Sequence, residues 1–349
     1  MAESSSTGPS SLENYDYELP DSAVAQRPLP RRDASRLLVL GEGGTLVDQG
    51  VGVFPSLLRE GDYLVVNDTR VRAARLRGRA GGREAEVLLV RDLQDGRHLA
   101  LVRPGRSLRI GREASGSGWR ARVVGLWEEH PGGRVVEVET DPGLELEELA
   151  EMPIPPYVRE PLADRDRYQT VYSTGAPRSA AAPTAGLHLT ERLLAQLEGG
   201  GVRVLRIQLE IGLATFVPIR VPDIEDHVMH RELFEVPEET ALAISGTRAA
   251  GGRVVAVGTT VVRCLESAVG SNGDVLAGQG ETDLYIKPGF QFQAVDGLLT
   301  NFHQPRSSLL VMVSAFFGHQ TVVDAYQHAL ERGYRFLSFG DCMFGWRST

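Results

Sequence analysis

The feature that most constrains the fold is a run of short alternating strands between residues 70 and 138. Apolar and polar residues alternate in four segments, which are 84–90, 98–102, 120–124 and 134–138. Such alternation is typical of strands with one buried face, and Gly-rich turns separate the segments. No helix is predicted in this run before Leu144. Several strands at near-regular spacing predict a small antiparallel barrel or sandwich.

The chain on both sides of this run predicts an α/β fold. Before it, residues 36–40 and 63–66 are short apolar segments bounded by Gly or Asp, as buried strands are. After Pro153, amphipathic helices alternate with apolar strands. The helices are expected at 190–198, 237–250, 261–269, 305–317 and 320–332, and the strands at 202–208, 232–236, 254–257, 283–286 and 298–300. This succession favours a sheet covered by helices.

Composition excludes several classes of protein. The first ten residues are Ser-rich, lack the pattern of a secretory signal and are expected to be disordered. The longest apolar run, Leu309–Phe317, is shorter than the roughly 20 residues of a membrane helix. Two cysteines, Cys264 and Cys342, form no C-x-x-C pair, which argues against a disulfide scaffold or a zinc knuckle. We therefore expect a cytoplasmic protein that is not bound to a membrane.

The charge of the chain is unevenly distributed. The formal net charge is −9, yet residues 69–125 contain 14 Arg and 5 acidic residues, a local balance of +9. A basic patch can collect phosphate contacts on an acidic protein, because local potential governs such contacts. Arg72, Arg75 and Arg77 are expected to belong to this patch. The alternative is that the arginines reflect a codon preference of the whole genome, since only one of the 37 basic residues is Lys.

A shaped loop is predicted around one histidine, His188. Pro183 restricts one φ angle, Gly186 permits conformations closed to other residues, and Thr190 is a plausible N-cap for the helix that follows. Such a loop can bring backbone close to a ligand. A tight turn that carries a structural histidine is the alternative interpretation.

Other polar residues follow predicted strands. Asn301 to His303 come after one strand and before a Pro-initiated helix, and Gly258 to Thr260 stand where another strand gives way to a helix. Ligands of α/β proteins bind at the carboxyl ends of strands, and helix N-termini offer free N–H groups to anions. Ordinary capped helix starts would explain both patterns as well.

Two further patterns are weaker. Residues 204–216 resemble the strand and Glu-x-Gly turn of methyltransferases, but Ala214, Phe216 and Pro218 do not fit that turn. His227, His230 and Glu232 form an H-x-x-H-x-E cluster, whose spacing is poor for a helical zinc site. A polar cluster that contacts substrate is favoured over a metal site, histidines that simply lie on the surface are the other alternative, and no metal is expected.

Seven segments occur in the order found in one enzyme family. They are 15–20, 61–70, 179–190, 227–232, 258–263, 300–310 and 334–341. On these segments the chain resembles the S-adenosylmethionine:tRNA ribosyltransferase-isomerases of queuosine biosynthesis, over nearly its whole length. The resemblance implies a β-barrel domain at 69–155, inserted into a large discontinuous open α/β barrel-like catalytic domain formed by 11–68 and 156–349.

The resemblance also implies a reaction. The ribosyl part of S-adenosylmethionine, the co-substrate, moves onto the aminomethyl group of a deazaguanine at the tRNA wobble position, and adenine and methionine leave. The product is epoxyqueuosine-tRNA. Its partners would be S-adenosylmethionine and the tRNA anticodon loop, and a monomer is expected. The alternatives are a related enzyme that acts on a free deazapurine or another small molecule, and a non-catalytic tRNA-binding protein.

Site residues are assigned on the segments that match. Those assigned to acid–base catalysis are His188, His230, Glu232, His303 and Asp341. Those assigned to substrate binding are Asn67, Asp68, Arg70, Pro183, Thr184, Gly186, Thr215, Phe216, His227, Gly258, Thr259, Thr260, Arg263, Asn301, Phe302 and Gly340. Phe216, Phe302 and Tyr285 are expected platforms for a splayed base. The chain departs from the family pattern at Glu210 and Ala214, where His and Gly are expected.

Overall fold

The computed structural model describes residues 8, 10–93, 95–128, 132–174, 177–212 and 218–348. Contacts divide them into two compact units. The first unit contains the described residues of 8–69, 155–174 and 183–348, and the second contains Arg70–Ile154 together with the described residues 177–182. The bounds 69–155 given above for the inserted domain stay a prediction.

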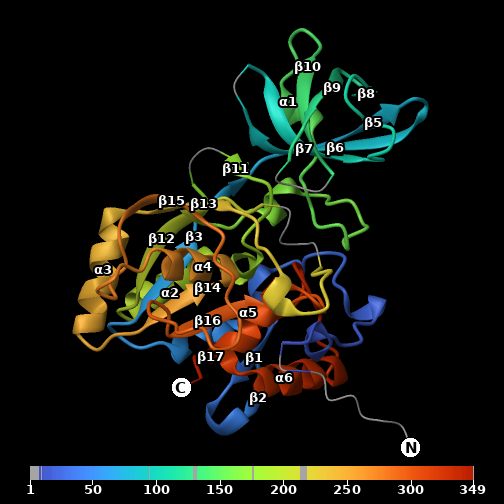
Figure 1. Ribbon diagram of the computed structural model, residues 1–349. Helices are drawn as coiled ribbons and strands as arrows, with labels where there is room; N and C mark the ends of the chain where they lie inside the picture. The colour runs from blue at the N-terminus through green and yellow to red at the C-terminus, as the bar shows by residue number, and fades with distance from the viewer. Residues whose placement is uncertain are drawn as a thin grey trace, which may run out of the picture. The chain divides into compact units, whose positions relative to one another are not determined.

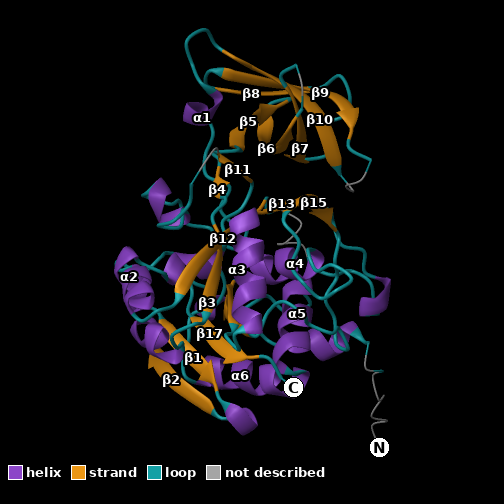
Figure 2. Cartoon of the chain, turned by 90° about the vertical axis from the view of Figure 1, so that its left-hand side faces the viewer, coloured by secondary structure: helices purple, strands orange, loops and turns teal. Residues whose placement is uncertain are grey.

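The first unit is built on a nine-stranded mixed sheet (Figure 2). In spatial order its strands are β15 (Gly278–Thr282), β13 (Glu232–Val236), β12 (Arg203–Leu209), β3 (Tyr63–Asn67), β14 (Val254–Val257), β16 (Gly297–Asn301), β17 (Cys342–Trp346), β1 (Arg36–Leu40) and β2 (Leu46–Gly50). Strands β12, β3, β14 and β16 run parallel, and β17 lies antiparallel to β16. The central strands are almost entirely buried, as expected for strands covered on both faces.

Helices cover this sheet. They are α2 (Glu191–Gly199), α3 (Glu238–Ala249), α4 (Thr259–Ser267), α5 (Ser308–Phe317) and α6 (His319–Glu331). The core includes Leu37, Phe54, Leu64, Val255 and Phe344, all fully buried. Among the described residues no single helix is long and apolar enough to cross a membrane; α5 and α6 would pass that test together, but the chain bends by 113° between them.

The second unit is a closed barrel of six strands (Figure 1). In barrel order they are β10 (Gly133–Thr140), β7 (Arg97–Arg103), β6 (Arg83–Asp92), β5 (Arg75–Ala80), β8 (Glu113–Gly116) and β9 (Trp119–Leu126), and all pairings are antiparallel. The unit also contains the short strands β4 (Arg70–Val71) and β11 (Pro177–Ser179) and the helix α1 (Leu146–Leu149). The predicted fold class, an α/β chain with a small β-barrel, is confirmed.

The barrel corrects part of the predicted basic patch. Arg72 and Arg75 are buried, Arg72 against Asp92 and Arg75 at 3.4 Å from Glu86. Their charges are used inside the unit and are not available to an external phosphate. Arg77 is exposed, but its Nε lies 3.0 Å from a carboxylate oxygen of Glu151, so its charge is paired as well.

One predicted strand is wrong. Residues 283–286 are not in a strand, and β15 lies just before them. Its sequence, GQGET, has no apolar alternation. The strand forms because it pairs antiparallel with β13, where the ring of Phe234 packs directly over Gly280. Strand β17 was not predicted either, since its pairing depends on neighbours far away in the sequence.

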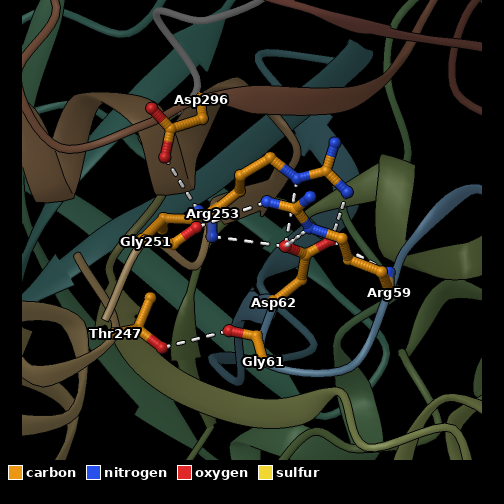
Figure 3. A network of polar contacts seen from close by, with 8 residues as sticks. Arg59, Gly61, Asp62, Thr247, Gly251, Arg253 and Asp296 are labelled. Atoms are coloured by element: carbon orange, nitrogen blue, oxygen red, sulfur yellow. Dashed lines mark hydrogen bonds and ion pairs between the residues drawn. The ribbon is translucent and has the colours of Figure 1, made fainter. Parts of the chain in front are cut away.

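A buried carboxylate fastens the amino ends of two central strands (Figure 3). Asp62, which is fully buried, accepts hydrogen bonds from the Arg253 guanidinium and from the backbone N–H of Arg59. Thr247 donates to the carbonyl of Gly61 at 3.1 Å. These contacts hold the starts of β3 and β14 together, at the end of the sheet opposite to the predicted site residues.

Candidate functional site

The sheet topology brings most predicted site residues to one edge. Strands β3, β14 and β16 are parallel and end at Asn67, Val257 and Asn301, so the residues that follow them emerge together. Since β17 is antiparallel to β16, its amino end at Cys342 lies at the same edge, opposite Asn301. This edge is where ligands of open α/β sheets bind.

His188 is held at this edge by Asn301. It ends the short 3-10 helix Thr184–His188 and is only 3% exposed. The Asn301 side-chain nitrogen lies 3.0 Å from His188 Nε2 and 3.3 Å from the carbonyl oxygen of Leu337. The Asn301 side-chain oxygen accepts from the Thr184 hydroxyl at 3.2 Å. The amide nitrogen therefore faces His188, because the Leu337 carbonyl can only accept.

This arrangement determines where His188 carries its proton. An amide nitrogen only donates, so His188 Nε2 must accept and the ring proton lies on Nδ1. Burial, followed by the guanidinium charges of Arg335 and Arg32, lowers the pKa of His188 to about 4. At neutral pH, His188 is thus an uncharged ring that presents an Nδ1–H donor.

His303 lies two residues beyond Asn301 and is also buried. Its Nε2 lies 2.9 Å from the Thr300 hydroxyl, and its backbone N–H donates to the Tyr326 hydroxyl at 2.9 Å. Its carbonyl accepts from the hydroxyl of Tyr17. Burial lowers the pKa of His303 to about 3, so this ring is neutral as well.

Asp341 is engaged by main-chain groups. Its two carboxylate oxygens accept the backbone N–H groups of Arg36 and Arg335, each at 2.8 Å, and the carboxyl is 2% exposed. Burial raises the pKa of the Asp341 carboxyl. Asp341 therefore fastens the start of β17 to β1, and Gly340 stands immediately before it. A positioning role fits this geometry better than proton transfer.

Glu232 and Arg263 form a buried ion pair. Each side chain is 6% exposed; the second oxygen of Glu232 accepts from the backbone N–H of Gly212 at 3.0 Å. Arg263 also donates to the carbonyl of Leu284 at 3.2 Å. Because both carboxylate oxygens are occupied, Glu232 ties β13, α4 and the end of β12 together.

His227 and His230 are partly exposed, and the His227 ring lies edge-on to that of Tyr285 with centroids 5.2 Å apart. Burial, followed by the nearby His230, lowers the pKa of His227. Within the described ranges no three His, Cys, Asp or Glu side chains are grouped to hold a metal ion. With Glu232 paired to Arg263, the H-x-x-H-x-E cluster is not a ligand set in this conformation.

Asn67 and Asp68 stabilise the exit of β3. The Asn67 amide exchanges two hydrogen bonds with the backbone of Leu209, at 3.0 and 3.1 Å, and thereby extends the pairing of β3 with β12. Asp68 accepts from the Thr174 hydroxyl at 2.8 Å, and its other oxygen is buried without a hydrogen-bond partner among the described residues. Arg70 belongs to the second unit, where it is exposed on β4.

Gly258 shapes the start of α4. Its φ of +90° lies in the region that favours glycine, and a Cβ there would lie 3.5 Å from the Ala185 side chain. Thr259 and Thr260 begin the helix, and the Thr260 hydroxyl has no described hydrogen-bond partner. Pro183 and Gly186 belong to the loop that carries His188. The two loops meet at Ala185.

One predicted platform is wrong. Phe302 is fully buried and packs against Tyr326, Tyr334 and Phe336, so its ring has no free face for a base. Tyr285 keeps partial exposure. The predicted residues Thr215 and Phe216 lie outside the described residues, as does Ala214.

Three arginines near His188 were not predicted. Arg32, Arg167 and Arg335 come from distant segments, and each donates to main-chain carbonyls in this region. Arg335 lies inside a segment that resembles the family, and Arg32 follows Arg31. Because the chain is rich in Arg throughout, neither position distinguishes these residues from its other arginines.

Two cavities accompany these groups. A small one of about 20 Å³ is lined by His188, Arg32, Arg167, Ser338 and Gly340, among others. A larger one of about 340 Å³ lies between the segment 14–18 and helices α5 and α6, and none of the predicted site residues lines it. The small cavity is the one that adjoins the predicted chemistry.

Comparison with known proteins decides the family. The model of the family described as queuosine biosynthesis protein matches residues 12–344. The chain belongs to this family. It is 50% identical over 340 residues to the S-adenosylmethionine:tRNA ribosyltransferase-isomerase of Moorella thermoacetica, covering 95% of this chain and 98% of that protein, and 44% identical over 342 residues to the enzyme so named from Halothermothrix orenii.

A solved structure supports the same assignment. The crystal structure of the S-adenosylmethionine tRNA ribosyltransferase from Thermotoga maritima matches with a TM-score of 0.54 and 34% identity, over 95% of this chain and 99% of that one. The resemblance stated from the sequence segments is thereby confirmed for this family member.

Proposed function

We propose that this chain is an S-adenosylmethionine:tRNA ribosyltransferase-isomerase. The observation that carries the proposal is its identity of 50% with a relative of that name over 95% of the chain. The ribosyl part of S-adenosylmethionine becomes bonded to the amine of the deazaguanine base. Adenine and methionine are released, and the sugar rearranges to an epoxycyclopentane without an external oxidant or reductant.

His188 is the proposed hydrogen-bond donor, since its ring is neutral at neutral pH and keeps its Nδ1 proton. Its Nε2 is occupied by Asn301, so Nδ1–H is the group that it can offer to substrate. A donor suits the departing adenine, whose leaving nitrogen gains negative charge. Asp341 and Glu232 are proposed as positioning residues, since both oxygens of each carboxylate are engaged.

The reaction can be tested directly. Purified protein is incubated with S-adenosylmethionine and tRNA that carries the aminomethyl-deazaguanine, and the digested nucleosides are analysed by mass spectrometry. Epoxyqueuosine with equimolar free adenine and methionine is expected. Turnover of only a free deazapurine would favour the small-molecule alternative, and binding of tRNA without turnover would favour a non-catalytic protein.

The same assay tests the donor. His188→Ala is expected to lower turnover by roughly 10²-fold or more, the scale for removing a hydrogen-bond donor to developing negative charge. His188→Asn should retain more activity than His188→Gln, because an Asn amide nitrogen overlies the Nδ1 position whereas that of Gln overlies Nε2. Equal activity of all three variants would remove His188 from the chemistry. A cytoplasmic location and a monomeric state stay predictions.

A further inference from the structure

The crevice beside His188 is surrounded by guanidinium groups that form no direct ion pair with a carboxylate among the described residues. Asp164 and Asp166 act on Arg32, and Asp341 on Arg335, only from a greater distance. Two of these groups, Arg32 and Arg167, line the crevice. The third, Arg335, lies close enough to His188 that its charge, next to the larger effect of burial, lowers the pKa of that ring. Within the described part of the chain, none of the three guanidinium groups lies within 4 Å of an acidic side chain. The neighbouring Arg31, by contrast, lies 3.4 Å from Asp33.

Main-chain carbonyls hold these guanidinium groups in place. Arg167 donates to the carbonyls of Leu29 and Pro30 at 2.7 and 2.9 Å, and Arg32 donates to that of Asp166 at 2.8 Å. A neutral carbonyl orients a guanidinium but leaves its net charge uncompensated. The guanidinium groups are therefore fixed in direction, and with no carboxylate bonded to them they can accept an anion as a direct partner.

Two buried guanidinium donors without an acceptor also favour an anion at this place. Nε of Arg167 and Nη1 of Arg335 are buried and have no hydrogen-bond partner among the described residues. Buried donors are rarely left without an acceptor, because each costs free energy comparable to a lost hydrogen bond. The Arg32 pKa is lowered by burial and then by the like charge of Arg167, a repulsion that a bound anion would relieve.

We propose that this crevice, here called the arginine crevice and defined by Arg32, Arg167 and Arg335, binds an anionic oxygen group of the substrate beside His188. The inference rests on the proposed function. Its volume of about 20 Å³ admits an oxygen atom rather than a whole ligand, so the rest of the anion lies at its mouth. Two sources offer this chemistry: a phosphate of the anticodon loop and the carboxylate of the methionine part of S-adenosylmethionine.

The test uses the full chain and separates the two sources. Arg167→Gln and Arg335→Gln are compared with wild type and with Arg165→Gln, a matched control that removes the same charge from the helix Arg165–Tyr168 outside the crevice. Dissociation constants for an anticodon stem-loop RNA are measured over a range of KCl concentrations, and those for S-adenosylmethionine by calorimetry. Thermal unfolding checks the fold, and Arg→Lys variants serve where a Gln variant does not fold.

A phosphate ligand predicts that each Gln variant binds RNA roughly tenfold more weakly, the scale of one charge-assisted hydrogen bond. The slope of log Kd against log salt should then fall by about 0.7 for each lost contact, while S-adenosylmethionine binding is unchanged. A carboxylate ligand predicts that each Gln variant binds S-adenosylmethionine more weakly while RNA binding is unchanged. That result supports the crevice equally well. If both variants match Arg165→Gln for both ligands while wild type forms product, the crevice is overturned and the proposed function stands; if wild type forms no product, the proposed function fails.

Discussion

Replacing Asn301 by leucine is expected to change which nitrogen of His188 carries the proton. The substitution keeps the branching of the side chain but removes the amide that donates to His188 Nε2, 3.0 Å away, and accepts from Thr184. A hydrogen bond of this kind contributes about 0.5–1.5 kcal/mol. Without it the bias towards the Nδ1–H form is lost, and kcat should fall by roughly two- to tenfold, since 1.4 kcal/mol is a factor of ten.

The assay is nitrogen NMR of protein labelled in its histidine rings, combined with a pH profile of kcat. In wild type, His188 should show a protonated Nδ1 and an unprotonated Nε2, with no titration between pH 5.5 and 8 because its pKa is about 4. In Asn301→Leu the Nε2-protonated form should appear. Thr300→Val, which removes the hydroxyl 2.9 Å from His303 Nε2, is the matched control and should leave the His188 signals unchanged.

Two results would refute this reasoning. One is a wild-type spectrum in which His188 carries its proton on Nε2, which would mean that the Asn301 amide points the other way. The other is an Asn301→Leu variant whose ring signals and kcat both equal those of wild type. A loss of stability alone, with unchanged ring signals, would make Asn301 a purely structural residue.

Four further predictions follow. Since burial keeps His188 and His303 neutral in the folded chain while the unfolded chain takes up protons near pH 6.5, the free energy of unfolding should fall as the pH drops from about 6.5 towards 4, by roughly 1.4 kcal/mol per pH unit for each histidine; His303→Gln should reduce this slope in denaturant titrations, and an equal slope would contradict the assignment. Asp62→Ala leaves the guanidinium that it binds without its partner and should lower the free energy of unfolding by about 2–4 kcal/mol, with kcat of the remaining folded protein unaltered. Arg106 and Arg109, which are exposed in the second unit, should contribute phosphate contacts, so replacing both with Gln should flatten the salt dependence of tRNA binding; an unchanged slope would make the arginine excess compositional. Dialysis against a strong chelator should leave activity intact, because the sulfonium already activates the leaving group; activity lost on dialysis and restored by zinc would reassign the histidine cluster.

Much of the fold could be predicted from local pattern. The strands at 36–40 and 254–257 have the predicted bounds, and the helix predicted at 190–198 forms one residue later, with Thr190 as its N-cap. These elements are recognisable because apolar periodicity and capping depend on residues a few positions apart. The same holds for the change from alternating strands to helices, which separated the barrel from the α/β unit.

The segments that carry the site could also be predicted, but not what their residues do. The sequence placed His188, Asn301 and Asp341 in segments that resemble the family, and the parallel strands bring them to one edge of the sheet. It could not show that Asp341 is occupied by the backbone of Arg36, 305 positions away, because that contact exists only once β17 lies between β16 and β1.

The tertiary structure alone decided three features. Gly278–Thr282 is a strand because β13 offers it a partner, although its residues show no strand pattern. The proton of His188 lies on Nδ1 because Asn301 is oriented by contacts from separate segments. Arg32, Arg167 and Arg335 lie around one crevice although more than 300 positions separate the first from the last. Local sequence determines which helices and strands form. The order of strands in the sheet determines which distant side chains come into contact, and the pKa values and charges of the site depend on those contacts.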